Sequence, residues 1–179
     1  MADFLRENLK KIGCEPSDLQ CEQLNNFHKI LCEWNEFMNL TGITEYNEVV
    51  IKHFVDSLAV NCVYSFKNTD RVVDIGTGAG FPGIPLKIMY PDTRFTLLDS
   101  LNKRIKFLDE VIRINSLDGI ETLHGRAEDY ARDKNYREAF DVCVSRAVAN
   151  LSTLSEYCLP YVKVGGVFIS YKAGQLDEE

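Results

Sequence analysis

Long apolar runs, paired cysteines and positive charge are all scarce in this chain of 179 residues. No apolar stretch approaches the roughly 20 residues that a helix needs to cross a bilayer, and the first residues lack the basic and apolar regions of a signal peptide. The six cysteines are scattered without a CxxC pair, which predicts neither a disulfide framework nor a metal site. We therefore expect a cytoplasmic protein with reduced cysteines, no membrane partner and no bound metal.

The net charge is −7 at pH 7, from 27 acidic and 20 basic residues. Taken as an average, this charge argues against a polyanionic partner, because proteins that bind nucleic acid usually present a basic surface. An average does not describe a local patch, however, and the densest basic cluster consists of Lys103, Arg104 and Lys106. The charge alone therefore leaves nucleic acid open as a partner.

Two patterns divide the sequence. Up to about residue 65, apolar residues recur at intervals of three and four, which predicts helices over 3–12, from a Ser17 cap to Met38, and over roughly 45–64. From residue 71, short β-branched runs alternate with helical segments. The candidate strands are 71–75, 94–98, 120–124, 140–145 and 166–171. The candidate helices are 82–90, 102–115, 128–132 and 151–162, with Gly165-Gly166 ending the last one.

Repeated strand–helix units of this length imply a mostly parallel sheet with right-handed crossovers and flanking helices. We predict an α/β, Rossmann-like fold for residues 66–179. Residues 1–65 are predicted to form an N-terminal helical extension that packs on this core.

The most informative stretch joins the first candidate strand to its helix and reads Asp74-Ile75-Gly76-Thr77-Gly78-Ala79-Gly80-Phe81-Pro82-Gly83. Glycine lets a backbone turn sharply and approach a ligand without a Cβ in the way. A strand, a glycine turn and a helix together hold nucleotide-like cofactors in open α/β sheets. We therefore predict a cofactor site at this turn.

Two cofactors fit the turn. Gly78, Gly80 and Gly83 satisfy G-x-G-x-x-G, and Asp99 at the end of the second strand suits a ribose diol, so an NAD-dependent reductase is one interpretation. The other interpretation starts from Asp74, an acid at the end of the first strand. Negative charge beside the glycines suits the amino group and sulfonium of S-adenosyl-L-methionine, whereas a pyrophosphate prefers bare N–H groups. We favour S-adenosylmethionine.

His53, Asp56 and Ser57 lie within about one turn of the third predicted helix. These are the residue types of a catalytic triad, but neighbouring positions on one helix point to different sides and do not build the triad geometry. We predict instead a hydrogen-bonded cluster near the cofactor pocket.

The glycine turn, with its Gly80-Phe81-Pro82 ending, resembles the first motif of the RsmG family, also called glucose-inhibited division protein B. Further matching blocks follow in the family's order and cover most of the chain: Asp99-Ser100-Leu101-Asn102-Lys103-Arg104, Gly125-Arg126-Ala127-Glu128-Asp129, Ser145-Arg146-Ala147-Val148-Ala149, and upstream Trp34-Asn35 with Asn39-Leu40-Thr41. The family consists of class I S-adenosylmethionine-dependent methyltransferases that methylate guanine N7 in 16S ribosomal RNA. The resemblance implies a seven-stranded sheet, so the last two strands are expected to be absent here.

The resemblance also implies roles for individual residues. In the cofactor site, Gly76, Gly78 and Phe81 would contact the methyl donor, Asp99 would hold the ribose hydroxyls, Ala127 and Glu128 would meet the adenine, and Arg146 would position the methyl group and the target base.

Several of these residues also have a purely structural interpretation. Asp99 and Ser100 could cap the next helix, and Glu128 could stabilise a helix dipole. Arg146 could pair with a carboxylate, and Phe81 could belong to the core.

Guanine N7 carries a lone pair and no proton, so the resemblance implies methyl transfer without a general base. N7 lies in the deep major groove of an RNA helix, so the target is expected in a loop or splayed out. Because the net charge is −7, we expect a small-subunit ribonucleoprotein particle as substrate, with RNA contacts from Arg146, Lys103, Arg104 and Arg126. A methyltransferase for another substrate class is the alternative.

Overall fold

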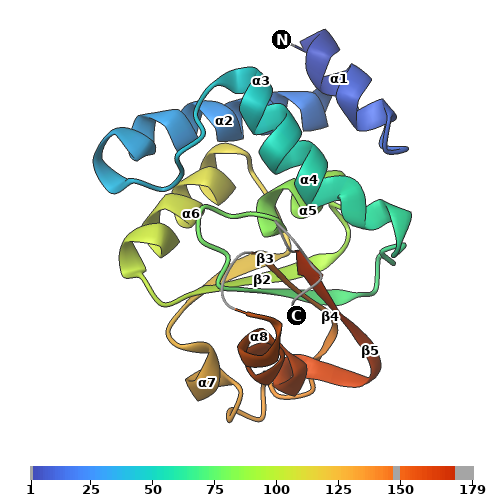
Figure 1. Ribbon diagram of the computed structural model, residues 1–179, viewed down its shortest axis with the longest axis vertical. Coiled ribbons are helices and arrows are strands. Elements are labelled where there is room, and N and C mark those ends of the chain that lie inside the picture. Colours follow the sequence, from blue (N-terminus) through green and yellow to red (C-terminus); the bar gives the residue numbers. More distant parts are fainter. Residues whose placement is uncertain (1, 147–149, 172–179) are drawn as a thin grey trace.

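Five parallel strands form the sheet at the centre of the computed structural model, which describes residues 2–146 and 150–171 (Figure 1). The strands are β1 (Arg71–Ile75), β2 (Arg94–Asp99), β3 (Ile120–His124), β4 (Phe140–Arg146) and β5 (Val162–Tyr171). Their order is β3-β2-β1-β4-β5, and every neighbouring pair is parallel. The order reverses beside β1, where open sheets of this kind bind ligands over the carboxyl ends of their strands. The predicted Rossmann-like fold is confirmed.

Helices precede the sheet and connect its strands. The first are α1 (Ala2–Lys10) and α2 (Asp18–Met38), followed by a continuous helical segment of α3 (Tyr46–Val49), the π-helical η1 (Val50–Val55), α4 (Asp56–Leu58) and the 3₁₀ turn η2 (Ala59–Cys62). The connecting helices are α5 (Gly83–Met89), α6 (Asn102–Ile114), α7 (Ala127–Tyr130) and α8 (Leu151–Cys158), the last continued by the 3₁₀ turn η3 (Leu159–Tyr161). All the predicted helices are present, most of them shorter than expected. The π-helical winding of η1 has no counterpart in the prediction.

Gln20 shows how a local signal also fixes a tertiary contact. Ser17 is the N-cap of α2: its Oγ accepts the Gln20 N–H at 3.2 Å, and Gln20 Oε1 accepts the Ser17 N–H at 2.8 Å. This is the predicted capping box. Gln20 Nε2 also donates to the carbonyl of Ile88 at 2.9 Å. Because Ile88 lies in α5, the residue that caps α2 also ties it to the helix behind the glycine turn.

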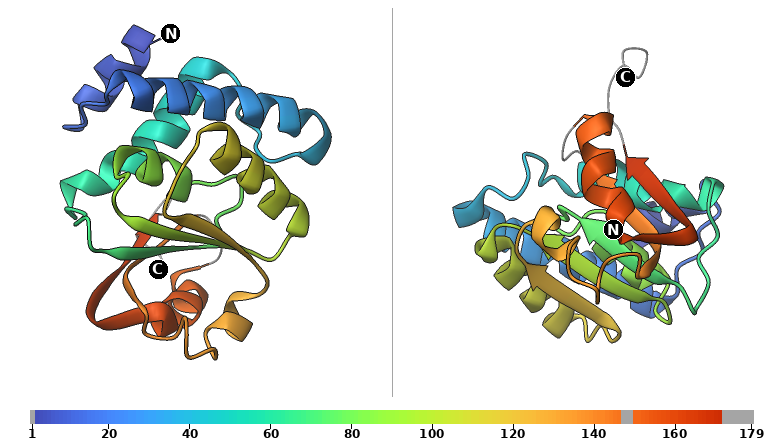
Figure 2. Two further views of the ribbon diagram at one scale, coloured as in Figure 1. Left: turned by 180° about the vertical axis from the view of Figure 1, so that it is seen from behind. Right: turned by 90° about the horizontal axis from the view of Figure 1, so that it is seen from below.

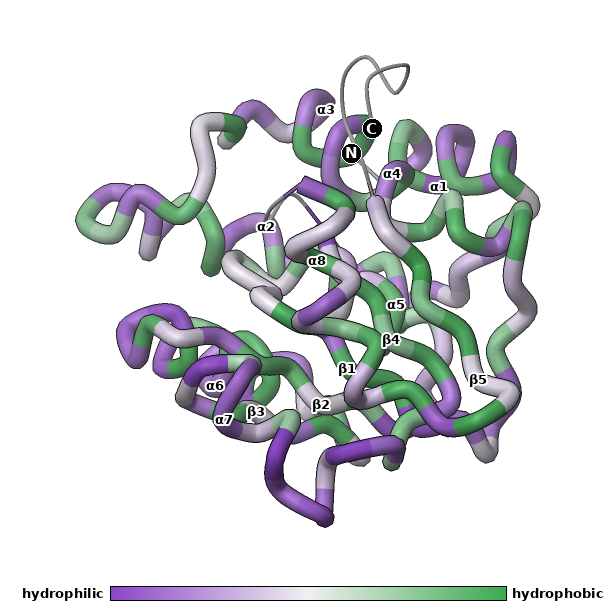
Figure 3. Tube along the Cα trace, turned by 60° about the horizontal axis from the view of Figure 1, so that its bottom comes forward, coloured by the Kyte–Doolittle hydropathy of each residue, from purple (hydrophilic) through white to green (hydrophobic). Residues whose placement is uncertain are grey.

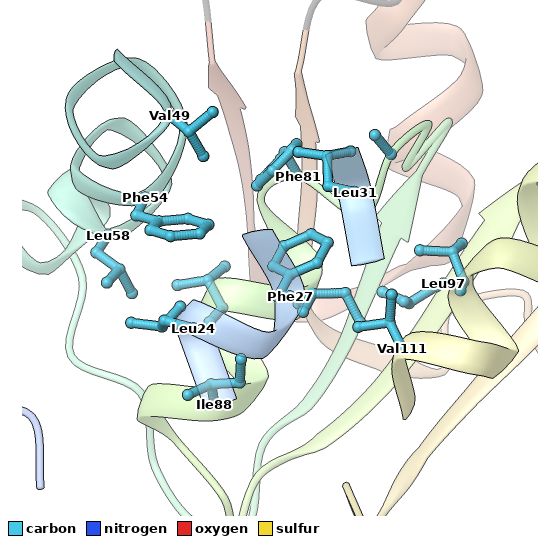
Figure 4. Packing of buried hydrophobic residues seen from close by; sticks show 14 of the residues in the cluster. Leu24, Phe27, Leu31, Val49, Phe54, Leu58, Phe81, Ile88, Leu97 and Val111 are labelled. Atoms are coloured by element: carbon cyan, nitrogen blue, oxygen red, sulfur yellow. The ribbon is translucent and has the colours of Figure 1, made fainter. Parts of the chain in front are cut away.

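One apolar core joins the N-terminal helices to the sheet face that carries α5 and α6 (Figure 2). Phe27 of α2 lies inside it, with its ring centroid 5.9 Å from that of Phe54, 5.0 Å from Phe81 and 6.3 Å from Phe107. Figure 4 shows Phe27 between Phe54 on one side and Val111 of α6 on the other. The apolar stripe of α2 therefore docks on the sheet domain, as predicted.

The opposite face of the sheet is covered by α7 and α8 (Figures 1 and 3). A second apolar cluster lies there and includes Phe140, Leu154 and Tyr161, all of which are almost completely buried. Helices thus cover both faces of the sheet, which accounts for the buried apolar residues of the inner strands β1 and β4, largely green in Figure 3. All six cysteines are free, and four are buried.

The predicted end of the last helix is wrong. α8 ends at Cys158, and Gly165-Gly166 lie inside β5 instead of closing the helix. Pro160 explains the early end, because proline cannot donate to the hydrogen-bond ladder of an α-helix. The absence of a side chain at Gly166 lets β5 approach β4 closely. A Cβ at this position would lie 2.7 Å from the carbonyl oxygen of Asp141, where the pairing of β4 with β5 shifts its register.

The helices before residue 66 share one core cluster with the sheet, and the division into domains at that residue stays a prediction. Within residues 2–146 and 150–171, no helix combines the length and the apolar character of a membrane span.

Candidate functional site

Hydrogen bonds join the backbone that follows β1 to the end of β2. Gly76 and Gly78 have φ angles of 69° and 60°, in the left-handed region that favours glycine. The N–H groups of Gly76 and Thr77 donate to the carbonyl of Leu98 at 2.9 and 3.0 Å, and the Gly78 N–H donates to Asp99 Oδ2 at 2.9 Å. Three consecutive residues of the turn are therefore fixed, which gives a ligand a rigid surface.

Asp74 supports the turn from beneath. Its carboxyl is fully buried, and Oδ2 accepts hydrogen bonds from Thr77 Oγ1 at 2.8 Å and from the Gly83 N–H at 2.9 Å. Oδ1 has no hydrogen-bond partner among the described residues. Burial raises the pKa of Asp74 from 3.8 to about 7. Asp74 thus sits beside the turn's backbone, as predicted, and shapes the loop. The expected negative charge facing the ligand is wrong, because the carboxyl is fully buried and burial favours its protonated form.

A cavity of 360 Å³ lies in front of the turn. It is lined by five of the predicted site residues, namely Gly76, Gly78, Phe81, Asp99 and Arg146. A Cβ at Gly78 would have no neighbouring atom closer than the carbonyl oxygen of Gly76 at 3.9 Å. Packing within the protein thus leaves space at Gly78, and a side chain there would take room from the cavity. This cradle fits a nucleotide-like cofactor.

A second cavity, of 520 Å³, contains the other two predicted residues, Ala127 and Glu128. Gly76 and Ser100 line both cavities, so the two adjoin. The Tyr161 hydroxyl donates to the carbonyl of Ala127 at 2.6 Å and fixes the start of α7. Hydrogen bonds from its own backbone N–H and from Arg126 lower the pKa of Glu128, so its carboxylate is charged at neutral pH.

The carboxylate of Asp99 is almost completely buried and has several partners. Oδ1 accepts the Leu101 N–H at 2.9 Å, and Oδ2 accepts the Gly78 N–H at 2.9 Å and Arg104 Nη1 at 3.2 Å. The N-cap of α6 is Leu101, so capping by Ser100 is wrong. Only Arg104, whose side chain is 35% exposed, could give way to a ribose hydroxyl without disturbing the backbone.

Arg146 ends β4 beside the first cavity. Its guanidinium lies over the ring of Phe81, with Cζ 4.9 Å from the ring centroid, and Nη1 donates to Asp56 Oδ2 at 2.9 Å. Arg146 therefore lies at the pocket, as its functional interpretation expects. It also pairs with a carboxylate, as its structural interpretation expects. Phe81 is 5% exposed and packs on Phe27 and Phe54, so it belongs to the core and also lines the cavity.

The cluster predicted on the third helix includes His53 and Asp56 but not Ser57. His53 stacks on Phe81 with a centroid distance of 4.5 Å, lines the first cavity and approaches Arg146. Burial, followed by the charge of Arg146, lowers the pKa of His53 to about 4. Ser57 is fully buried, and its Oγ has no hydrogen-bond partner among the described residues.

Sequence reasoning considered Ser100 only as a possible helix cap and gave no role to Leu40 and Thr41, yet all three residues line the cavity. Leu40 and Thr41 belong to the Asn39-Leu40-Thr41 block that carries part of the family resemblance, and Ser100 follows Asp99 in another such block. These matches could have drawn attention to the three positions.

Comparison with known proteins decides the family. The profile of the family described as rRNA small subunit methyltransferase G matches residues 20–179. The chain belongs to this family. A relative in Lachnoclostridium phytofermentans, named ribosomal RNA small subunit methyltransferase G, is 55% identical over 173 residues, which are 97% of this chain and 72% of the relative. A relative of the same name in Alkaliphilus metalliredigens is 51% identical over 178 residues, 98% of this chain and 74% of the relative.

Solved structures outside the rRNA small subunit methyltransferase G family share the fold. A putative caffeoyl-CoA O-methyltransferase from Staphylococcus aureus has a TM-score of 0.54 at 16% identity, covering 80% of this chain and 65% of that one. A SAM-dependent methyltransferase from Thiobacillus denitrificans, in complex with S-adenosyl-L-homocysteine, has a TM-score of 0.52 at 16% identity, covering 64% of this chain and 46% of that one. Membership of the family confirms the methyltransferase interpretation over the reductase, with S-adenosylmethionine as the cofactor.

Proposed function

We propose that this chain transfers a methyl group from S-adenosylmethionine to N7 of a guanine in 16S ribosomal RNA. The observation that carries the proposal is the pair of adjoining cavities at the carboxyl ends of the strands, because together they are lined by every residue that the family resemblance assigns to the site. The relatives named ribosomal RNA small subunit methyltransferase G support RNA as the class of substrate.

The proposed roles follow the two cavities. Ala127 and Glu128, which line the larger cavity, would contact the adenine, and Asp99 would accept hydrogen bonds from the ribose hydroxyls. Gly76 and Gly78 would allow close approach of the cofactor to the backbone. Phe81 and Arg146 line the smaller cavity, where the target base would meet the methyl group.

S-adenosylmethionine supplies a methyl group bound to a positively charged sulfur. With both reactants bound, the lone pair of N7 would form the new C–N bond as the C–S bond breaks and leaves its electron pair on sulfur. N7 carries no proton, so the site needs no general base, and the protein's task is to hold the two reactants in line. Such positioning supplies ~7–11 kcal/mol in favourable cases.

Several cations surround the mouth of the site. Arg146 and Arg104 line the smaller cavity, Arg126 lines the larger one, and Lys103 is exposed in the first turn of α6. We assign these residues to contacts with RNA phosphates or bases. Because the net charge is −7, a small-subunit ribonucleoprotein particle in the cytoplasm is the proposed substrate rather than naked 16S rRNA.

The test is a map of N7-methylguanine in 16S rRNA from cells with the gene, cells without it and deleted cells that carry it on a plasmid. We expect one modified nucleotide to lose its methyl group on deletion and to regain it with the plasmid. A map that is identical in all three strains would overturn the proposal. Purified protein should methylate particles from the deleted strain faster than bare 16S rRNA, and equal rates would refute the preference for a particle.

A further inference from the structure

Arg104 has two proposed contacts that its one side chain cannot make at the same time. It lines the 360 Å³ cavity and is assigned to RNA, yet its guanidinium is paired with Asp99, the proposed partner of the ribose hydroxyls. Nη1 donates to Asp99 Oδ2 at 3.2 Å, and this is the one hydrogen bond of the guanidinium within residues 2–146 and 150–171. The arginine therefore occupies a cofactor contact while it is held away from RNA.

The lone pairs of Asp99 show that the two contacts compete. A carboxylate has about four lone pairs, two on each oxygen. Oδ1 uses one of them for the Leu101 N–H, and Oδ2 uses both, for the Gly78 N–H and for Arg104. One lone pair on Oδ1 remains, whereas a ribose diol offers two donors. Because the other two donors are backbone N–H groups that hold the glycine turn and the start of α6, Arg104 is the donor that has to leave.

We propose that Arg104 couples the two binding steps: Asp99 releases the guanidinium when it accepts the ribose hydroxyls, and the released guanidinium binds an RNA phosphate. The proposal rests on the functions proposed above for Asp99 and Arg104. It goes further, because it predicts that the protein binds the cofactor before the RNA, an order that neither assignment contains alone.

Arg146, the other arginine of this cavity, is held more firmly than Arg104. Its Nη1 donates to Asp56 Oδ2 at 2.9 Å, its guanidinium lies over the ring of Phe81, and its side chain is 16% exposed. The Arg104 side chain is 35% exposed and makes its one contact at 3.2 Å. An ion pair that is open to solvent on the arginine side contributes little free energy. Of the two arginines, Arg104 is therefore the one that can reorient at a small cost.

The start of α6 is the surface to which the released guanidinium returns. Residues 102–108 contain three cations and no acidic residue, and the two lysines, Lys103 and Lys106, are exposed. While Arg104 is paired with Asp99, a carboxylate balances one of these three charges. Release adds a third unbalanced positive charge, and affinity for RNA rises with the number of phosphates that a protein neutralises. The cofactor-loaded protein is therefore the form with the higher affinity for RNA.

The ion pair of Arg104 with Asp99 opposes both binding steps, because it has to break for either ligand to bind. Removing the pair should therefore strengthen cofactor binding and RNA binding by the same factor. Ion pairs of this kind contribute little, so we expect a factor of about two to five. Linkage requires the reciprocal effect, in which bound RNA strengthens cofactor binding by that factor.

The first test uses the wild-type protein. Its affinity for small-subunit particles from the deleted strain is measured by filter binding, with and without saturating S-adenosyl-L-homocysteine. This compound keeps the ribose and lacks the transferable methyl group, so no reaction occurs. We expect the particles to bind about two- to fivefold more tightly when it is present. Equal or weaker binding would overturn the coupling.

The second test measures the binding of S-adenosyl-L-homocysteine by calorimetry, without RNA. Arg104→Met removes the charge and keeps a side chain that favours a helix. We expect the variant to bind about two- to fivefold more tightly than the wild type, because the competing donor is gone. The matched control is Lys103→Met, because Lys103 is exposed next to Arg104 in the sequence while Arg104 is the residue paired with Asp99. The control should bind with wild-type affinity, and unchanged or weaker binding by Arg104→Met would refute the competition.

The two variants are then compared in the filter-binding assay. Both should bind the particles more weakly than the loaded wild type, but only Lys103→Met should still respond to S-adenosyl-L-homocysteine. A response that persists in Arg104→Met would assign the coupling to another residue and overturn the proposal. The calorimetric result does not depend on RNA, so its failure is distinguishable from an absence of rRNA methylation, which would overturn the proposed function instead.

Discussion

Asp74→Asn tests whether the buried carboxyl beneath the glycine turn is ionised at a cost in stability. The asparagine amide oxygen can accept the hydrogen bonds from Thr77 and Gly83, and it never ionises, so the variant imitates the protonated acid. In the wild type the pKa is raised from 3.8 in the unfolded chain to about 7 in the folded protein. The folded state therefore binds the proton more tightly, and the stability present at low pH is lost as the pH rises from about 4 to about 7.

The magnitude follows from the shift. Each pH unit between the two pKa values lowers the free energy of unfolding by ~1.4 kcal/mol, and the fall levels off above the folded pKa. Between pH 5 and pH 8 this one group should cost the wild type ~2–3 kcal/mol, a cost that Asp74→Asn does not have.

The assay is urea unfolding of both proteins at pH 5, 6, 7 and 8. All other groups titrate alike in the two proteins, so the difference between their free energies of unfolding isolates Asp74. We expect that difference to shift in favour of the variant by ~2–3 kcal/mol over the range. Two parallel stability profiles would refute the raised pKa and with it the account of the turn.

Two further substitutions test the walls of the cavities. Gly78→Val and its control Gly13→Val place the same side chain at φ angles of 60° and 74°, with no neighbouring atom closer than 3.9 Å in either case. Both should lose ~1–2 kcal/mol of stability through the left-handed backbone, but only Gly78→Val should weaken S-adenosylmethionine binding, by more than about tenfold in calorimetry; equal affinities would place the cofactor elsewhere. Tyr161→Phe removes the 2.6 Å hydrogen bond to the Ala127 carbonyl, which then keeps only the Ala131 N–H at 2.9 Å. It should lower the free energy of unfolding by ~0.5–1.5 kcal/mol, and an unchanged urea midpoint would contradict this role.

The sheet could be predicted well because its signals are local. The run Arg71–Ile75 is short, rich in apolar β-branched residues and followed directly by the glycine turn, and its observed limits are those predicted. The capping box at Ser17 and Gln20 likewise depends only on residues three positions apart. Gly165-Gly166 misled the prediction, because a glycine that ends a helix and one that admits a neighbouring carbonyl look the same in a sequence.

The site could be predicted in part. Spacing and resemblance identified the residues on the turn and at the strand ends, and the structure brings them to two adjoining cavities. The contacts across the molecule could not be foreseen. Arg146 meets His53 and Asp56 only because β4 and the helical segment before the sheet converge at the same cavity, across more than 80 positions of the sequence. Such pairings depend on tertiary packing, which no local pattern encodes.

The π-helical winding of η1 limits how this segment can change during evolution. A π-helical turn corresponds to an α-helix that has gained a residue, and deleting one residue from η1 would relax it to α-helical winding. Each residue of an α-helix adds about 100° of rotation, so His53 would turn away from Arg146 if the deletion preceded it. We expect insertions and deletions to be excluded from residues 50–55 in functional members of the family, while conservative substitutions on the exposed side of the segment are tolerated.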